Sequence, residues 1–203
     1  MPRWQANAPE RLVLAALDLF AEHGYENTTV IEIAERAGVT KSTFFRHFRD
    51  KREVLFSQET MSTVLVDAIA AAPADAAPLE IVASAIEAAG SEFLTPTRRA
   101  LGARRHAVIA ANPELQEREA LKRLALTADM VEALEQRGID PMTARVAAEL
   151  GSLAFTIAYD RWADPTRDAA SSNLVLEAIS ELQAASSAAL TRSCARLGRD
   201  LRA

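Results

Sequence analysis

The stretch AGVTKSTFFRHFRDKREVLF, residues 37–56, decides the fold. Gly38 is a natural end for the helix that precedes it, and Thr40 is a natural cap for the helix that follows. Only the three residues 38–40 then separate two short helices. Two short helices joined by a glycine-bearing turn of about this length are the helix-turn-helix pattern.

The residues before this stretch carry matching helix signals. Residues 8–29 read APERLVLAALDLFAEHGYENTT, in which Pro9 suits a first helical turn and Gly24 suits a helix end. The next helix is expected to begin at Thr28 or Thr29. A glutamate stands three residues after Thr29, which predicts a capping box.

The residues after this stretch predict further helices. Asp50 is expected to cap a long amphipathic helix over about residues 51–72, with Glu53 in the position for a second capping box. Gly and Pro number only 7 and 8 among 203 residues, while good helix formers are abundant, which favours an all-α fold. About nine helices are expected, the later ones at about 79–93, 96–111, 114–137, 142–163 and 172–197.

Positive charge is concentrated in one place. The chain has a net charge of -5, yet six basic residues and one acidic residue lie between Arg36 and Arg52. A local basic patch on an acidic protein indicates a polyanionic partner that docks on one face. A solvated surface is the alternative interpretation of such a charge run.

The second helix of a helix-turn-helix motif lies in the major groove of DNA, so its residues are the candidate contacts. Phe44 and Phe48 are four residues apart and are expected to anchor this helix to the core. Phe45 either touches a thymine methyl group or is buried with them, and for His47 a solvated or capping role is favoured over a base contact. The candidate DNA-binding residues are Thr29, Thr40, Lys41, Ser42, Thr43, Phe45, Arg46, His47 and Lys51.

Residues 28–56, TTVIEIAERAGVTKSTFFRHFRDKREVLF, preceded by LFAEHGYENTT, resemble the TetR family of transcriptional repressors. The family usually has Gly at position 42, where this chain has Ser42, and Tyr at position 45, where it has Phe45. The hydroxyl of that tyrosine commonly bonds a phosphate, and a phenylalanine cannot make this contact. A TFFR sequence, as at residues 43–46, occurs in a subset of the family that includes regulators that sense acyl-CoA-like ligands. The matching positions are Leu19, Phe20, Gly24, Tyr25, Thr28, Thr29, Ile33, Ala34, Ala37, Gly38, Val39, Thr40, Thr43, His47, Phe48 and Lys51.

The resemblance implies a homodimeric repressor that binds a palindromic operator in double-stranded DNA and is released by a small apolar or acyl-CoA-like ligand. It implies a DNA-binding domain at residues 1–56 and a helical ligand-binding and dimerisation domain at residues 57–203. The last two long helices, about 142–163 and 172–197, would form the dimer interface. Their apolar stripes are explained equally well by packing within one chain.

The ligand half of the sequence is less specific. An arginine cluster beside an apolar pocket suits a phosphorylated, lipid-like ligand, but pairing of these arginines with neighbours such as Glu114 and Glu117 is the favoured alternative. Each apolar candidate is also more simply explained as core. The candidate ligand residues are Phe93, Arg98, Arg99, Arg105, Met130, Phe155, Tyr159 and Trp162.

Other functional classes find little support in the sequence. The three histidines lack partners at catalytic or metal-ligand spacing, so no enzyme, metal or cofactor is expected. The single cysteine, Cys194, is expected to be a small apolar residue rather than a reactive thiol. No signal peptide and no apolar run of roughly 18 residues is visible, so a cytoplasmic protein without a membrane span is expected. A helical adaptor with an acidic partner, or an activator with the same DNA-reading helices, remains an alternative.

Overall fold

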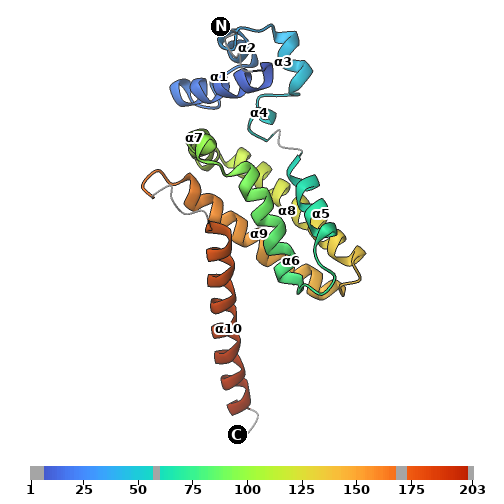
Figure 1. The fold of residues 1–203 in the computed structure, drawn as a ribbon. Helices are drawn as coiled ribbons and strands as arrows, with labels where there is room; N and C mark the ends of the chain where they lie inside the picture. The colour runs from blue at the N-terminus through green and yellow to red at the C-terminus, as the bar shows by residue number, and fades with distance from the viewer. Residues whose placement is uncertain (1–6, 57–59, 168–172, 201–203) are drawn as a thin grey trace. The chain divides into compact units, whose positions relative to one another are not determined.

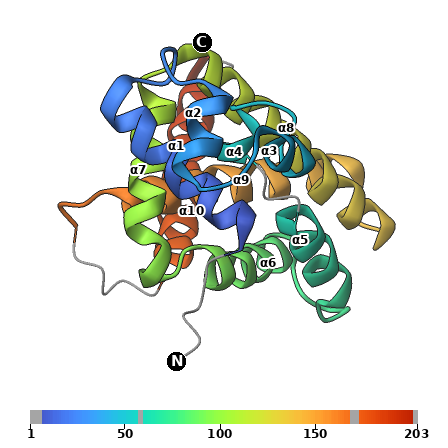
Figure 2. The same cartoon turned by 90° about the horizontal axis from the view of Figure 1, so that it is seen from above.

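The computed structural model describes residues 7–56, 60–167 and 173–200, and every regular element in these ranges is a helix (Figure 1, Figure 2). The all-α prediction is therefore confirmed. The elements are α1 (Ala8–His23), α2 (Val30–Arg36), α3 (Lys41–His47), α4 (Glu53–Phe56), α5 (Thr60–Ala71), α6 (Pro78–Phe93), the 3₁₀ turn η1 (Pro96–Arg98), α7 (Arg99–Ala110), α8 (Pro113–Gln136), α9 (Pro141–Ala163) and α10 (Leu174–Asp200).

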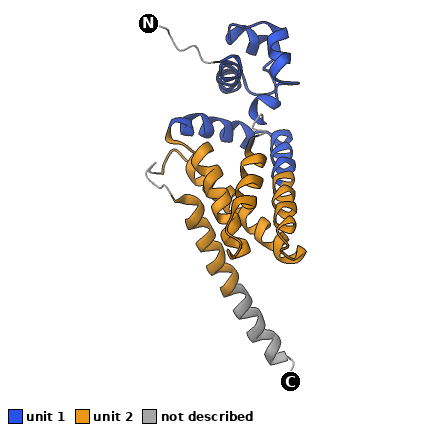
Figure 3. Ribbon diagram, turned by 45° about the vertical axis from the view of Figure 1, so that its right-hand side comes forward, with its two compact units in different colours: residues 1–60, 97–123 blue, residues 61–96, 124–203 orange. Residues whose placement is uncertain are grey.

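The chain divides into two compact units (Figure 3). Unit 1 consists of residues 1–60 and 97–123, and unit 2 consists of residues 61–96 and 124–203. Unit 1 thus combines the helix-turn-helix segment with α7 and the first part of α8. The boundary between a DNA-binding domain and a ligand-binding domain at residues 56 and 57 stays a prediction.

The local helix signals act where the sequence places them. Pro9 lies in the first turn of α1, and Gly24 follows the helix with a φ of 82°. Thr29 caps α2 in a capping box with Glu32. The helix predicted over 51–72 is described as α4 and α5, and the residues between them lie outside the described part of the chain.

The core of unit 1 is built from α1 to α4 with contributions from α7 and α8. Leu12, Leu17, Ile33 and Phe44 are fully buried in it. Because α1, α2 and α3 each contribute buried side chains to this one core, burial fixes how the three helices pack. The core therefore sets the orientation of α3, whose outer face is the candidate DNA contact.

The core of unit 2 depends on small residues of α9, which pack against α6 and α10. Gly151 is the tightest point, because a Cβ added there would lie 2.2 Å from Val82 Cγ1 and 2.8 Å from Ile86 Cδ1. Real carbon atoms do not approach so closely, so α6 and α9 can pack at this distance only with glycine at position 151.

Gly151→Ala is expected to destabilise the protein. The added methyl group overpacks the contact with Val82 and Ile86, and we expect a loss of about 1–3 kcal/mol in the free energy of unfolding. Urea unfolding followed by circular dichroism measures the loss.

Gly90→Ala is the matched control, because Gly90 also lies inside a helix of unit 2 but its added Cβ would meet Val175 Cγ2 at an ordinary 3.6 Å. We expect this variant to be neutral or stabilised by up to about 1 kcal/mol, since alanine favours helices over glycine. Equal destabilisation by both substitutions would contradict the packing argument.

Within the described residues, none of the helices is both long enough and apolar enough to cross a membrane.

Candidate nucleic-acid interface

The turn between α2 and α3 is held by local hydrogen bonds. Gly38 adopts a φ of 66°, which side chains other than glycine disfavour. The Val39 amide donates to the Ala34 carbonyl oxygen at 2.9 Å, which closes the end of α2. The Thr40 hydroxyl accepts from the Thr43 amide at 3.1 Å, which starts α3. The start of the second helix is thereby fixed relative to the first.

The three phenylalanines of α3 and its end divide between core and surface. Phe44 and Phe48 are 0% and 3% exposed, so they hold the helix to unit 1. Phe45 is 48% exposed, although it stands next to Phe44 in the sequence. The alternative in which Phe45 is buried is therefore wrong, and its ring is available to an external partner.

The basic patch contains two different groups of side chains. Lys41, Arg46 and Arg49 are exposed, and no hydrogen bond or ion pair of their side chains is found among the described residues. Arg36 instead makes two hydrogen bonds to the Glu22 carboxylate, at 2.7 and 2.9 Å. The exposed group of Lys41, Arg46 and Arg49 has positive charge available for a polyanion. In the paired group, to which Arg36 belongs, the charge is already compensated by carboxylates.

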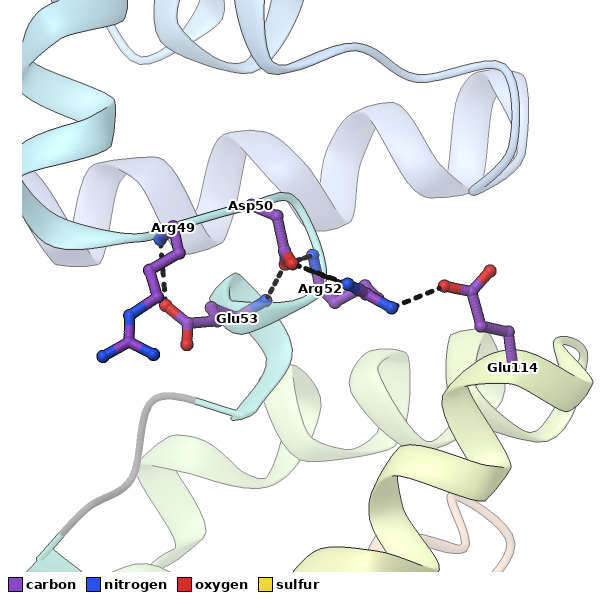
Figure 4. A network of polar contacts seen from close by, with 5 residues as sticks. All are labelled: Arg49, Asp50, Arg52, Glu53 and Glu114. Carbon is purple, nitrogen blue, oxygen red and sulfur yellow. Dashed lines mark hydrogen bonds and ion pairs between the residues drawn. The ribbon is translucent and has the colours of Figure 1, made fainter.

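Arg52 also belongs to the paired group (Figure 4). Its guanidinium binds the Asp50 carboxylate at 2.9 Å and the Glu114 carboxylate at 3.0 Å. The Asp50 carboxylate also caps α4, since it accepts from the backbone amides of Arg52 and Glu53 at 2.8 and 3.0 Å. The Glu53 carboxylate accepts from the Arg49 amide at 2.9 Å instead of the Asp50 amide, so the second capping box takes a different form from the one predicted.

The electrostatics of this network hold Asp50 in its charged form. Partial burial works to raise the pKa of Asp50, but hydrogen bonds from the Arg52 side chain and from backbone amides lower it below its ordinary value. A group whose pKa is lower in the folded chain stabilises the fold above its ordinary pKa. That stabilisation is lost as the pH falls through the folded pKa.

Asp50→Asn is expected to remove this pH-dependent stability, because it keeps the oxygen acceptor of the cap and loses the charge. The wild-type protein should be more stable than the variant near pH 7, and the difference should shrink as the pH falls through about 3.8 and below. Urea unfolding at a series of pH values measures both proteins. A difference that does not change with pH would contradict the assigned role of the Asp50 carboxylate.

Several predicted contact residues already have partners within unit 1. The Thr29 hydroxyl takes part in the capping box with Glu32, and the Thr40 and Thr43 hydroxyls bond each other at 2.9 Å. Lys51 Nζ donates to three backbone carbonyl oxygens of the loop between α1 and α2. By contrast, Ser42 and His47 of α3 are exposed.

The candidate ligand residues fall in both units. Arg98, Arg99 and Arg105 belong to unit 1, and the remaining five belong to unit 2. Arg105 donates to the Leu55 carbonyl oxygen at 2.6 Å and to the Glu119 carboxylate at 3.0 Å. The neighbouring Arg104 pairs with Asp18. These arginines therefore connect helices of unit 1, with acidic partners other than those considered from the sequence.

Three of the apolar candidates of unit 2 belong to its core, with Phe155 packed against the cluster that contains Phe93 and Met130. Phe93, Met130 and Trp162 are buried, and Tyr159 lies between Phe155 and Trp162 with ring centroids 6.5 and 5.6 Å away. Sequence reasoning missed a polar contact in this unit, in which the Ser62 hydroxyl donates to the Asp129 carboxylate. The two residues are 67 positions apart, so no local pattern could have paired them.

Metal-ligating side chains do not cluster in the described part of the chain. Its His, Cys, Asp and Glu residues form no group of three that could hold a metal ion. Cys194 lies in α10 among the residues whose side chains are not described.

The model of bacterial regulatory proteins of the tetR family matches residues 12–57. The HTH-type transcriptional regulator TcmR of Streptomyces glaucescens is 39% identical over 80 residues, which cover 39% of this chain and 35% of that protein. The fatty acid metabolism regulator protein of Bacillus subtilis is 36% identical over 47 residues, which cover 23% and 24%. The matched segments thus span about a third or less of these relatives.

Solved structures of low sequence identity share the fold across most of the chain. NalD, the secondary repressor of the MexAB-OprM multidrug efflux pump in Pseudomonas aeruginosa, gives a TM-score of 0.56 at 21% identity and covers 86% of this chain and 95% of that one. FadR of Thermus thermophilus, solved in complex with lauroyl-CoA, gives a TM-score of 0.50 at 24% identity and covers 86% and 93%. At these identities the likeness concerns the fold alone.

Proposed function

Residues 12–57 match the model of bacterial regulatory proteins of the tetR family, and on that premise we propose that this chain is a sequence-specific DNA-binding transcriptional regulator. The observation that carries the proposal is the division of α3 into two faces. Phe44 is completely buried, whereas Lys41, Phe45 and Arg46 are exposed on the same seven-residue helix. A helix anchored on one side and basic on the other suits the major groove.

The roles of the exposed residues follow from their chemistry. Arg46 can donate two hydrogen bonds to a guanine edge, and the ring of Phe45 can touch a thymine methyl group. Lys41 and the hydroxyl of Ser42 stand in the first turn of α3, where contacts to phosphate oxygens fix the register on the duplex. Arg49 lies beyond the end of α3 and adds attraction for the duplex.

A homodimer is the second part of the proposal. Met142, Val146 and Leu153 are 72%, 50% and 47% exposed, and their spacing places them on one stripe of α9. On α10, residues 183–188 are exposed on every side of the helix. Contiguous exposed apolar surface marks an interaction site, so a second chain that covers α9 and this part of α10 accounts for both observations. A dimer of this kind presents two α3 helices to a palindromic operator.

A small-molecule effector that releases the operator is the third part, which makes the protein a repressor. The Bacillus subtilis relative is a fatty acid metabolism regulator, and the Thermus thermophilus structure holds lauroyl-CoA. In this chain, Phe155 and Tyr159 are partly buried aromatic side chains of unit 2 that suit an apolar ligand. Because Arg105 is already engaged by Leu55 and Glu119, a small apolar ligand is favoured over one held by a phosphate group. Such a ligand weakens DNA binding only by its greater affinity for the conformation that does not bind DNA.

The test is fluorescence anisotropy of the purified protein with duplexes from upstream of its own coding region, at about 150 mM salt with excess random DNA. Competitor-resistant binding of two protomers to one palindrome is the expected result. Equal binding to random DNA by folded protein would refute the proposal and favour an adaptor with an acidic partner.

A further inference from the structure

Lys51 connects two parts of unit 1 that are distant in the sequence. Its Nζ donates to the carbonyl oxygens of Tyr25, Glu26 and Thr28 at 2.7, 3.1 and 3.3 Å. The same atom lies 4.2 Å from the centre of the Tyr25 ring, within the range of a cation–π contact. Lys51 follows α3 in the chain, and the three carbonyl groups precede α2.

The loop that Lys51 binds also has contacts of its own, among them a hydrogen bond from the Thr28 amide to the Tyr25 carbonyl oxygen at 3.3 Å. Gly24 turns the chain with a positive φ, and the Thr28 hydroxyl donates to the Gly24 carbonyl oxygen at 2.9 Å. Tyr25 is 3% exposed and packs edge-on against Phe20, with ring centroids 5.2 Å apart. The loop carbonyls that point to Lys51 receive all three donors of one ammonium group, which a lysine supplies and a planar guanidinium does not.

This loop leads directly into a predicted DNA contact. Thr29 follows Thr28, and its capping box with Glu32 starts α2. The side chain of Ile33 in α2 then packs with Phe44 of α3 in one core. The position of the loop therefore sets the start of α2, and through the core it sets α3.

We infer that Lys51 is a positioning residue, whose ammonium fixes the loop before α2 and so aligns the two helices of the motif, and that it does not contact a DNA phosphate. The inference rests on the proposed function only for the part that concerns DNA. The loop contact itself belongs to the protein without DNA. The sequence predicted a DNA contact for Lys51, and its three carbonyl partners argue for this different role.

Amine labelling tests the contact directly, because the chain has only three lysines. Lys41 is exposed, whereas Lys51 is bound to the loop. Lys122 Nζ donates to the Phe56 carbonyl oxygen, so Lys122 serves as an internal reference for a hydrogen-bonded lysine. Acetylation followed by peptide mass spectrometry is expected to modify Lys41 several-fold faster than Lys51. Addition of a random-sequence duplex at about 50 mM salt should protect Lys41 and leave the rate at Lys51 unchanged. Fast labelling of Lys51 in the DNA-free protein, followed by protection with DNA, would overturn the inference.

Salt dependence of DNA binding provides a second test with matched variants. Each phosphate contact contributes about 0.9 to the slope of log K against log salt concentration. Lys41→Met is expected to lower the magnitude of this slope by about that amount if Lys41 contacts a phosphate, whereas Lys51→Met should leave it unchanged and lower the melting temperature. A drop of about 0.9 in the slope for Lys51→Met would show a phosphate contact and overturn the inference.

Lys51→Arg keeps the test decisive even where Lys51→Met does not fold. Arginine preserves the charge and the ability to bind phosphate, but its five donors lie in one plane, whereas the three loop carbonyls converge on a single nitrogen atom. We expect a lower melting temperature with an unchanged salt slope. An unchanged melting temperature would overturn the inference. If wild-type protein binds no DNA, the proposed function fails, while the labelling of the DNA-free protein still tests the loop contact.

Discussion

Phe44→Ala is expected to lower the free energy of unfolding of unit 1 by about 3–5 kcal/mol, the largest loss from a single substitution that we anticipate. The Phe44 side chain is 0% exposed and packs in the core with side chains of α1 and α2. Its ring also lies near that of Phe48, with centroids 5.6 Å apart. Removal of the ring leaves a cavity at the centre of the small core, which the short helices around it cannot fill. Thermal and urea unfolding of the full chain measure the loss.

Phe45→Ala is the matched control, since it makes the same chemical change one residue later in the same helix. Phe45 is 48% exposed, so we expect a loss of less than about 1 kcal/mol in the free energy of unfolding. Operator affinity should fall if the ring touches a thymine methyl group in the groove. Similar destabilisation by the two substitutions would contradict the division of α3 into a core face and an outer face.

The double variant Lys41→Ala with Arg46→Ala is expected to lower operator affinity by about 30-fold or more, because each lost contact costs about 1–3 kcal/mol. Both side chains are exposed, and neither has an ion-pair partner among the described residues. They therefore reach DNA without first breaking an ion pair within the protein. Anisotropy titrations at fixed salt concentration measure the loss. If Arg46→Ala alone also flattens the preference among operator variants, Arg46 reads a base, whereas a uniform loss identifies a phosphate contact.

The control for this variant removes the same charge from the paired group. Arg36→Ala with Arg52→Ala deletes two guanidinium groups that bind Glu22, Asp50 and Glu114. Because these charges are compensated within unit 1, we expect a loss of affinity several-fold smaller than that of the first double variant. Equal losses would mean that only the total charge of the patch matters.

The division of the basic patch explains why its charge alone was an ambiguous signal. Six basic residues within 17 positions could all face a polyanion or could all be solvated. The structure instead leaves Lys41, Arg46 and Arg49 exposed and gives partners to the others. The interface proposed for DNA is thus smaller than the patch, and it is centred on α3.

The sequence by itself determined the helices and the turn of the motif. Pro9 and Gly24 bound α1, Thr29 caps α2 with a carboxylate three residues away, and Thr40 caps α3. Each of these signals acts within about four residues, because helix capping and helical periodicity join neighbours along the chain. Local spacing also placed Phe44 and Phe48 on the core side of α3.

Only the tertiary structure decided the partners of the long charged side chains and the exposure of Phe45. Lys51 binds carbonyl groups 23–26 residues away, and Arg105 binds the Leu55 carbonyl oxygen 50 residues away. A flexible side chain with several donors can reach many groups, so its partner depends on which distant helices pack beside it. That packing is a property of the assembled core, and for this reason residues of one basic run acquire different roles.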